Sequence, residues 1–129
     1  MTGRWQLNLV KSHLAPAPAW RSQALLMSRD GDWTVRTVEY VYAKNIERFP
    51  VRYREDGKDY PAASKRTTYA LTRVDDRRWK GTEKLDGAVV GVYDQTLSPD
   101  GHQLTIYHTT FDRRGKPLGT SVEVFDKIR

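Results

Sequence analysis

The sequence predicts an all-β fold, a single up-and-down antiparallel β-barrel of about eight to ten strands that takes up the 129 residues as one domain. Runs rich in Val, Ile, Thr and aromatic residues recur along the chain between turns that contain Gly, Pro or Asp. Residues 88–111 show the repeating unit, two such runs joined by the reverse turn Ser98-Pro99-Asp100-Gly101. Because the connections are short, the strands form a meander, and closing this sheet removes its two exposed edges.

About nine strands are expected in order along the chain. Residues 5–9 alternate Trp, Leu and Leu against Gln and Asn, which is the period of a half-buried strand. Residues 11–21 contain two spaced prolines and indicate an extended connector across one end of the sheet. The remaining strands are predicted at residues 22–28, 33–42, 48–54, 67–74, 78–85, 88–97, 103–111 and 118–127. A β-sandwich would need more long crossovers than the two long connections, 11–21 and 59–66, supply.

Alternation along each strand indicates which side chains face the interior. In residues 48–54, Phe49, Val51 and Tyr53 lie opposite three arginines, so the apolar face points inward. Residues 33–42 carry apolar side chains on both faces, so their pattern alone does not name the inside. Carried through the turns, the prediction places in the interior Leu25, Met27, Trp33, Val35, Thr37, Glu39, Phe49, Val51, Tyr53, Tyr69, Leu71, Trp79, Gly81, Tyr93, Gln95, Leu97, Leu104, Ile106 and His108.

This predicted interior is too polar for a dry core. A buried hydroxyl or imidazole without a partner costs about 1–3 kcal/mol, so several polar tips on one interior indicate mutual hydrogen bonds, enclosed water or a ligand. We therefore expect a cavity, with Gly81 leaving space where a packing-only strand would carry Val or Ile. The alternative is that the same aromatic rings simply fill the barrel.

Several stretches carry a resemblance to known proteins: Trp5-Gln6-Leu7-Asn8-Leu9-Val10-Lys11-Ser12, Asp56-Gly57-Lys58-Asp59-Tyr60-Pro61, Arg73-Val74-Asp75-Asp76-Arg77, Ser98-Pro99-Asp100-Gly101 and Asp112-Arg113-Arg114-Gly115-Lys116-Pro117. Together they resemble a family of small bacterial lipocalin-like proteins, mostly uncharacterised. The similarity covers nearly the whole chain and its motifs mostly mark turns, so it implies a calycin-type barrel, similar in shape to lipocalins and fatty-acid-binding proteins. The resemblance transfers no catalytic signature.

The leading functional prediction is binding of a small, largely apolar ligand, aromatic or acyl, in the barrel interior. The predicted ligand-binding residues are Trp33, Tyr53, Tyr69, Arg73, Trp79, Tyr93, Gln95 and His108. The aromatic side chains would form the walls, and the polar tips would orient the polar end of the ligand. Arg73 or the basic rim would meet an acid group.

A second hypothesis is a cofactor-independent enzyme of the cyclase, isomerase or cycloaddition type that uses the same pocket. Here His108 would carry acid–base chemistry, oriented by Glu39. A lone histidine on an apolar face is more often a core residue, and Glu39 is expected rather to pair with an interior arginine such as Arg73. Glu83 and Glu123 are expected to be solvated charges near strand ends. A third hypothesis is a filled barrel with a structural or interaction role.

Composition limits the partners. The net charge of +6 admits an acidic partner, but the basic residues form short groups interleaved with Asp and Glu, so we expect no nucleic-acid binding. The chain has no cysteine, and its three scattered histidines predict no metal site. No phosphate loop or dinucleotide motif is visible, so no cofactor is expected. Without a run long enough to span a bilayer, we expect a soluble, cytoplasmic monomer or homodimer, although a removed leader would leave no trace.

Overall fold

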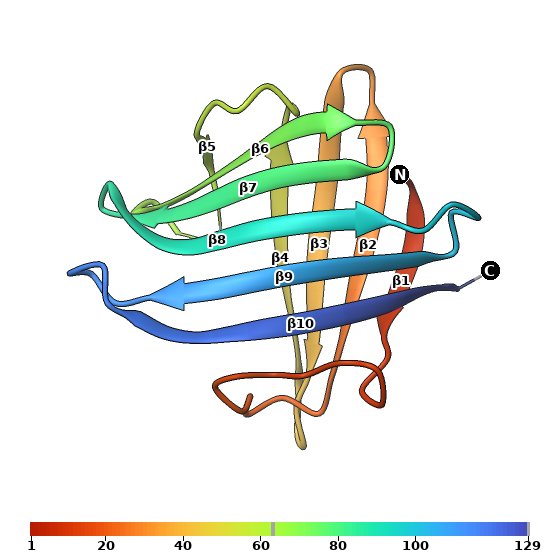
Figure 1. The fold of residues 1–129 in the computed structure, drawn as a ribbon, viewed down its shortest axis with the longest axis horizontal. Coiled ribbons are helices and arrows are strands. Elements are labelled where there is room, and N and C mark those ends of the chain that lie inside the picture. Colours follow the sequence, from red (N-terminus) through yellow and green to blue (C-terminus); the bar gives the residue numbers. More distant parts are fainter. Residues whose placement is uncertain (63, 129) are drawn as a thin grey trace.

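The computed structural model describes residues 1–62 and 64–128, and within them the chain forms ten strands and no helix. The strands are β1 (Gly3–Leu7), β2 (Ser22–Asp30), β3 (Trp33–Val41), β4 (Ile46–Tyr53), β5 (Tyr60–Pro61), β6 (Thr67–Asp75), β7 (Arg78–Leu85), β8 (Ala88–Leu97), β9 (Gln103–Phe111) and β10 (Pro117–Ile128) (Figure 1). All belong to one antiparallel sheet in the order β4-β3-β2-β1-β10-β9-β8-β7-β6-β5. The all-β, up-and-down prediction is confirmed. A search of the described residues for a membrane-spanning helix finds none.

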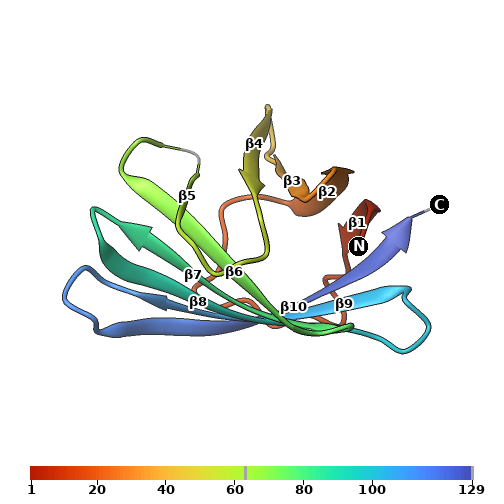
Figure 2. The same ribbon diagram turned by 90° about the horizontal axis from the view of Figure 1, so that it is seen from above.

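The first strand, β1, pairs with the last strand, β10, as well as with β2. It pairs with β10, with Leu7 opposite Phe125, and with β2, with Gly3 opposite Met27. Consequently the first and last strands meet, as the barrel prediction requires. The sheet curls around its interior until its two edges approach each other, and β4 contacts β5 and β6 there (Figure 2). The result is a nearly closed barrel.

Turn chemistry explains where the strands end. Asp86 and Gly87 have φ angles of 51° and 82°, the two positive values that a tight hairpin turn requires between β7 and β8. In the next turn the Ser98 hydroxyl donates to Asp100 at 2.6 Å, and the Gly101 N–H donates to the Ser98 carbonyl at 2.9 Å. Strand β5 was not predicted, because two residues that include a proline show no alternation.

Two adjoining clusters of side chains fill much of the interior. The first consists of Trp5, Leu7, Leu25, Met27, Val38, Leu104, Ile106 and Phe125. The second consists of Val51, Tyr53, Tyr69, Leu71 and Trp79. Tyr93 and Leu97 pack against both clusters, so the core is continuous across the barrel.

Strand β3 turns the opposite face inward from the predicted one. Thr34, Arg36 and Val38 are buried, and Val38 lies opposite Leu25 of β2. The predicted interior positions Trp33, Val35, Thr37 and Glu39 therefore lie on the outer face, and this part of the prediction is wrong. The sequence misled because β3 has apolar residues on both faces and a charged residue, Arg36, on the inner one.

Trp33 consequently does not form part of the cavity wall, contrary to the prediction. The guanidinium carbons of Arg52 and Arg54 lie 4.3 and 4.4 Å from the centre of its ring, and the ring of Tyr60 meets it edge-on at 5.5 Å. These stacked cations cover the apolar faces of the indole on the outer surface, which accounts for its partial burial there.

Glu39 of β3 links β1, β3 and β4 from outside the barrel. Its Oε1 accepts from Arg4 Nη2 of β1 and its Oε2 from Arg48 Nε of β4, both at 2.9 Å, and the glutamate is only 6% exposed. The expected partner Arg73 is wrong, because Arg73 contacts Asp76 on an exposed turn. The hydrogen bond from Arg4 lowers the pKa of Glu39 below its usual value, burial opposes this, and the bond from Arg48 lowers it further.

We expect Glu39→Gln to reduce the free energy of unfolding at pH 7 by about 1–2 kcal/mol, because two charge-assisted hydrogen bonds are weakened. Since the folded-state pKa is lowered, this stabilisation is present above about pH 5 and is lost as the pH falls through the folded pKa. Urea unfolding of both proteins between pH 7 and pH 3 measures the difference. Glu47→Gln on β4, which has no described ion pair, is the control; a constant difference between wild type and Glu39→Gln at every pH would contradict the assignment.

Candidate functional site

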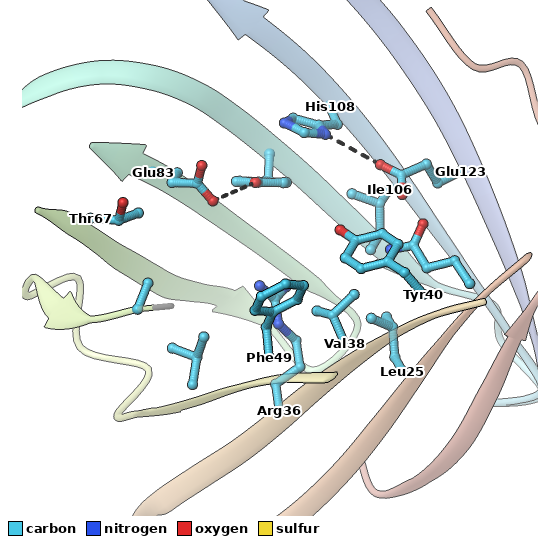
Figure 3. Close-up of a pocket in the computed structure, with 14 residues that line it drawn as sticks. Leu25, Arg36, Val38, Tyr40, Phe49, Thr67, Glu83, Ile106, His108 and Glu123 are labelled. Carbon is cyan, nitrogen blue, oxygen red and sulfur yellow. Dashed lines mark hydrogen bonds and ion pairs between the residues drawn. The ribbon is translucent and has the colours of Figure 1, made fainter. Parts of the chain in front are cut away.

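The interior of the barrel contains a cavity of about 310 Å³ (Figure 3). Its apolar lining is formed by Leu25, Val38, Phe49, Val51, Ala62 and Ile106. These side chains come mainly from β2, β3, β4 and β9, on opposite walls of the barrel. The predicted interior cavity therefore exists, and its charged side chains fall into two polar sets.

The first polar set is centred on Arg36, which is 9% exposed and lines the cavity. Its Nη1 donates to the Tyr69 hydroxyl at 3.2 Å, and its guanidinium carbon lies 4.3 Å from the centre of the Tyr69 ring. Gln95 Nε2 donates to the same hydroxyl, also at 3.2 Å. Arg36 Nε has no partner, and no carboxylate of the described residues lies within ion-pair distance of the guanidinium. Among residues 1–62 and 64–128, this permanently charged group thus has only a phenol as hydrogen-bond acceptor.

The second polar set is a row across four consecutive strands, β7 to β10. Tyr93 donates its hydroxyl hydrogen to Glu83 Oε2 at 3.2 Å, and its ring stacks on His108 with centroids 4.2 Å apart. His108 Nδ1 lies 3.4 Å from Glu123 Oε1. We call Glu83, Tyr93, His108 and Glu123 the acidic row. All four residues line the cavity (Figure 3).

The tyrosines of the cavity are neutral at physiological pH. Burial raises the pKa of Tyr40 to about 12, and the charge of Glu123 adds to this shift. Burial also raises the pKa of Tyr93 well above its usual value, and Glu83 contributes in the same direction. Both side chains therefore keep their hydroxyl hydrogens and act as donors.

The structure separates the predicted site residues. Tyr93 and His108 line the cavity, whereas Tyr53, Tyr69 and Gln95 are buried behind its wall. Trp79 is also buried outside the cavity and donates its Nε1 hydrogen to Glu55 at 2.9 Å.

The two predicted site residues that carry charge need correction. The Arg73 side chain lies near the end of β6, is 46% exposed and is outside the cavity, so it is not positioned to meet an acid there. Glu39 lies on the outer face of the barrel and cannot orient His108.

Sequence reasoning missed the three charged residues of the cavity, Arg36, Glu83 and Glu123. Arg36 fell on the outside because the faces carried through the turns placed Trp33, Val35, Thr37 and Glu39 inside. Glu83 and Glu123 were expected to be solvated near strand ends, but Glu123 is 8% exposed and both line the cavity. Their inward phase was the available signal: Glu83 alternates with Trp79, and Glu123 lies opposite Ile106. In the part of the chain that the structure describes, no three His, Asp or Glu side chains gather as metal ligands would.

The connector between β1 and β2 crosses one end of the barrel, as expected (Figure 1). Ala15 exchanges hydrogen bonds with the Ser121 hydroxyl at 3.0 and 3.1 Å, and the ring of Trp20 lies 5.6 Å from that of Tyr40. Residues of the connector share a smaller adjoining cleft of about 250 Å³ with Tyr40, His108 and Glu123. The connector therefore lies directly beside the acidic row.

No family model matches this chain, and no curated protein matches its sequence. A solved structure described as "REP1-NXSQ fatty acid transporter" is similar in fold, with a TM-score of 0.65 over 99% of this chain and 96% of that chain. This chain and that structure share the fold of a nearly closed, up-and-down antiparallel β-barrel. The sequence identity is 8%, so the likeness shows the fold alone.

Gly81 has a different role in this barrel from the predicted one. A Cβ atom at Gly81 would lie 2.8 Å from the Ala70 carbonyl oxygen and 2.9 Å from Leu71 Cδ1. Glycine is therefore required by the close approach of β6, and Gly81 is not among the residues that line the cavity. At Gly91 the nearest atom to such a Cβ is His108 Nε2, at 3.2 Å.

We expect Gly81→Ala to reduce the free energy of unfolding by about 2 kcal/mol, because the added methyl group meets backbone that cannot move aside. Gly91→Ala is the matched control and should cost less than half as much, since its nearest neighbour is a side chain. Chemical denaturation of both variants makes the comparison. Equal losses, or a larger loss at Gly91, would show that the approach of β6 is not the limiting contact.

Proposed function

We propose that the barrel binds a small, largely apolar ligand with an acid group, aromatic or acyl, and that this acid group meets Arg36. The observation that carries the proposal is a buried guanidinium that lines the cavity without a carboxylate partner among the described residues. Such a charge costs several kcal/mol to bury when it is not paired. An anionic ligand would supply the missing partner and offset this cost.

The neighbours of Arg36 support this role. The Tyr69 hydroxyl accepts from the guanidinium and is itself held by Gln95, and neither side chain adds negative charge. A fixed guanidinium loses little conformational freedom when it binds a carboxylate, and a planar carboxylate matches its geometry. In this proposal Arg36, and not the predicted Arg73, meets the acid group of the ligand.

The apolar lining and the size of the cavity suggest the ligand body. Leu25, Val38 and Phe49 offer aliphatic and aromatic contacts to an acyl chain or a ring. A volume of 310 Å³ lies at the lower end of the range for small-molecule pockets, about 300–1,000 Å³, which favours a short acid over a long one. The fold likeness to a protein described as a fatty acid transporter agrees with an acyl or aromatic acid.

A second candidate function is the cofactor-independent enzyme. The observation that favours it is His108 Nδ1 at 3.4 Å from Glu123 Oε1 beside the cavity, a pair that replaces the predicted His108 and Glu39. In this candidate His108 moves a proton and Glu123 orients its imidazole. The family of small bacterial lipocalin-like proteins, the cytoplasmic location and the oligomeric state stay predictions from the sequence.

We expect Arg36→Met to weaken octanoate binding by about 10- to 100-fold, because a charge-assisted contact is lost. The variant should be as stable as wild type or more so, since an apolar side chain of similar volume replaces an unpaired buried charge. Arg73→Gln is the matched control, because Arg73 is exposed near the end of β6 and outside the cavity, and it should leave affinity unchanged. Isothermal titration calorimetry measures affinity, and urea unfolding measures stability. Tight octanoate binding by Arg36→Met, or equal affinity of wild type for octanol and octanoate, would contradict the proposal.

The two candidate functions differ in what His108→Asn should do. For a binding protein, octanoate affinity should change only a few-fold, because the acid lies at Arg36. For an enzyme, the variant should keep affinity for its natural ligand and stop converting it. Mass spectrometry of the small molecules that co-purify with wild type and with His108→Asn from the native host makes the test, since an enzyme would accumulate a different species in the variant.

A further inference from the structure

The charged side chains that line the cavity do not balance. Arg36 contributes one positive charge, and the acidic row contributes two carboxylates, Glu83 and Glu123. Neither carboxylate forms an ion pair with an arginine or lysine of residues 1–62 or 64–128. When an acid occupies Arg36 and His108 is neutral, the two carboxylates remain uncompensated. Protonation of His108 compensates one of them and leaves the other.

Each carboxylate of the acidic row also has a free oxygen. Glu83 uses Oε2 for the Tyr93 hydroxyl, and Glu123 uses Oε1 for His108. Among the described residues, no donor reaches Glu83 Oε1 or Glu123 Oε2. Hydrogen-bond acceptors at the edge of a partly apolar cavity gain most from a charged donor, because an ammonium group supplies both hydrogen atoms and positive charge.

Arg36 and the acidic row lie on different walls. Arg36 extends from β3, whereas the acidic row comes from β7 to β10 on the opposite layer, and apolar side chains such as Val38 and Phe49 lie alongside (Figures 1 and 3). A donor-rich wall thus faces an acceptor-rich wall. A ligand with only one polar end leaves one of these walls without a partner.

We propose that Glu83 and Glu123 form a second subsite that binds a protonated amine, so that the ligand is a small apolar body with an acid group at one end and an amine at the other. The inference rests on the proposed function, which places the acid at Arg36. An ammonium group at the acidic row, together with the carboxylate at Arg36, makes the ligand neutral overall. Binding then adds no net charge to the barrel interior, and both polar sets gain a partner.

The test compares each amino acid with the same acid lacking the amine. The pairs are 8-aminooctanoic acid with octanoic acid, and 4-(aminomethyl)benzoic acid with 4-methylbenzoic acid; the two pairs space the charged groups differently. Calorimetry with wild type should show at least a tenfold gain in affinity from the amine in one pair or both. In the double variant Glu83→Gln, Glu123→Gln this gain should disappear, while octanoate binds as well as to wild type or more tightly.

Asp94→Asn is the matched control, because Asp94 lies on β8 between Tyr93 and Gln95 but pairs with Arg78 on the outer face. This variant should keep the full gain from the amine. Thermal unfolding checks that each variant is folded, and Glu83→Gln alone, at the half-buried position, replaces the double variant if the latter does not fold. The single variant should lose part of the gain.

The outcomes separate the two proposals. If neither amino acid binds more tightly than its counterpart, or if the gain survives removal of the carboxylates, the amine subsite is overturned while octanoate binding through Arg36 still stands. If octanoate binding takes up a proton, as calorimetry in buffers of different ionisation enthalpy would show, and the amine adds nothing, protonation balances the charges and the subsite is overturned. If octanoate binding does not depend on Arg36, the proposed function itself fails.

Discussion

The pairing of β1 with β10 determines what the rest of the structure can be. Because β1 lies between β10 and β2, the sheet has to curl, and each strand has one inner and one outer face. Any side chain on an inner face must then pack, find a polar partner or line a cavity. Glu39 strengthens this arrangement from outside, since its bonds to Arg4 and Arg48 reach across β1, β2, β3 and β4. The barrel that surrounds the polar cavity is therefore stabilised by strand pairing and by contacts outside the cavity.

The interior side chains differ in what they contribute to stability. Aromatic and aliphatic side chains such as Trp5, Phe125 and Leu104 are almost completely buried and supply most of the apolar burial. Arg36 and the acidic row are polar groups that do not stabilise a packed core, and their burial opposes folding unless they are paired. Their retention inside a barrel with a hydrophobic core is therefore more readily explained by binding than by stability.

Much of the fold could be predicted from the sequence, because turns and alternation are local signals. Asp86-Gly87 and Ser98-Pro99-Asp100-Gly101 form the expected turns, and in β4 the inner face carries Val51 and Tyr53 as alternation indicates. Strand β5 lay beyond such reasoning, since its two residues pair with Tyr69 and Thr68 only through the tertiary fold. The closed arrangement followed from the short connections and the need to cover sheet edges.

The candidate site was predicted less well, above all because the two faces of β3 were exchanged. The faces carried through the turns placed Trp33 inside and therefore Arg36 outside, and the structure does the opposite. Arg52 and Arg54 cover the faces of Trp33, which removes the cost of leaving the indole on the surface. Nothing described covers the charge of Arg36 in the same way, because Tyr69 gives it a ring and a hydroxyl but no carboxylate. The reversal thus leaves its unbalanced charge inside the barrel, where a ligand can bind it, and this is the position at which patterning and function conflict.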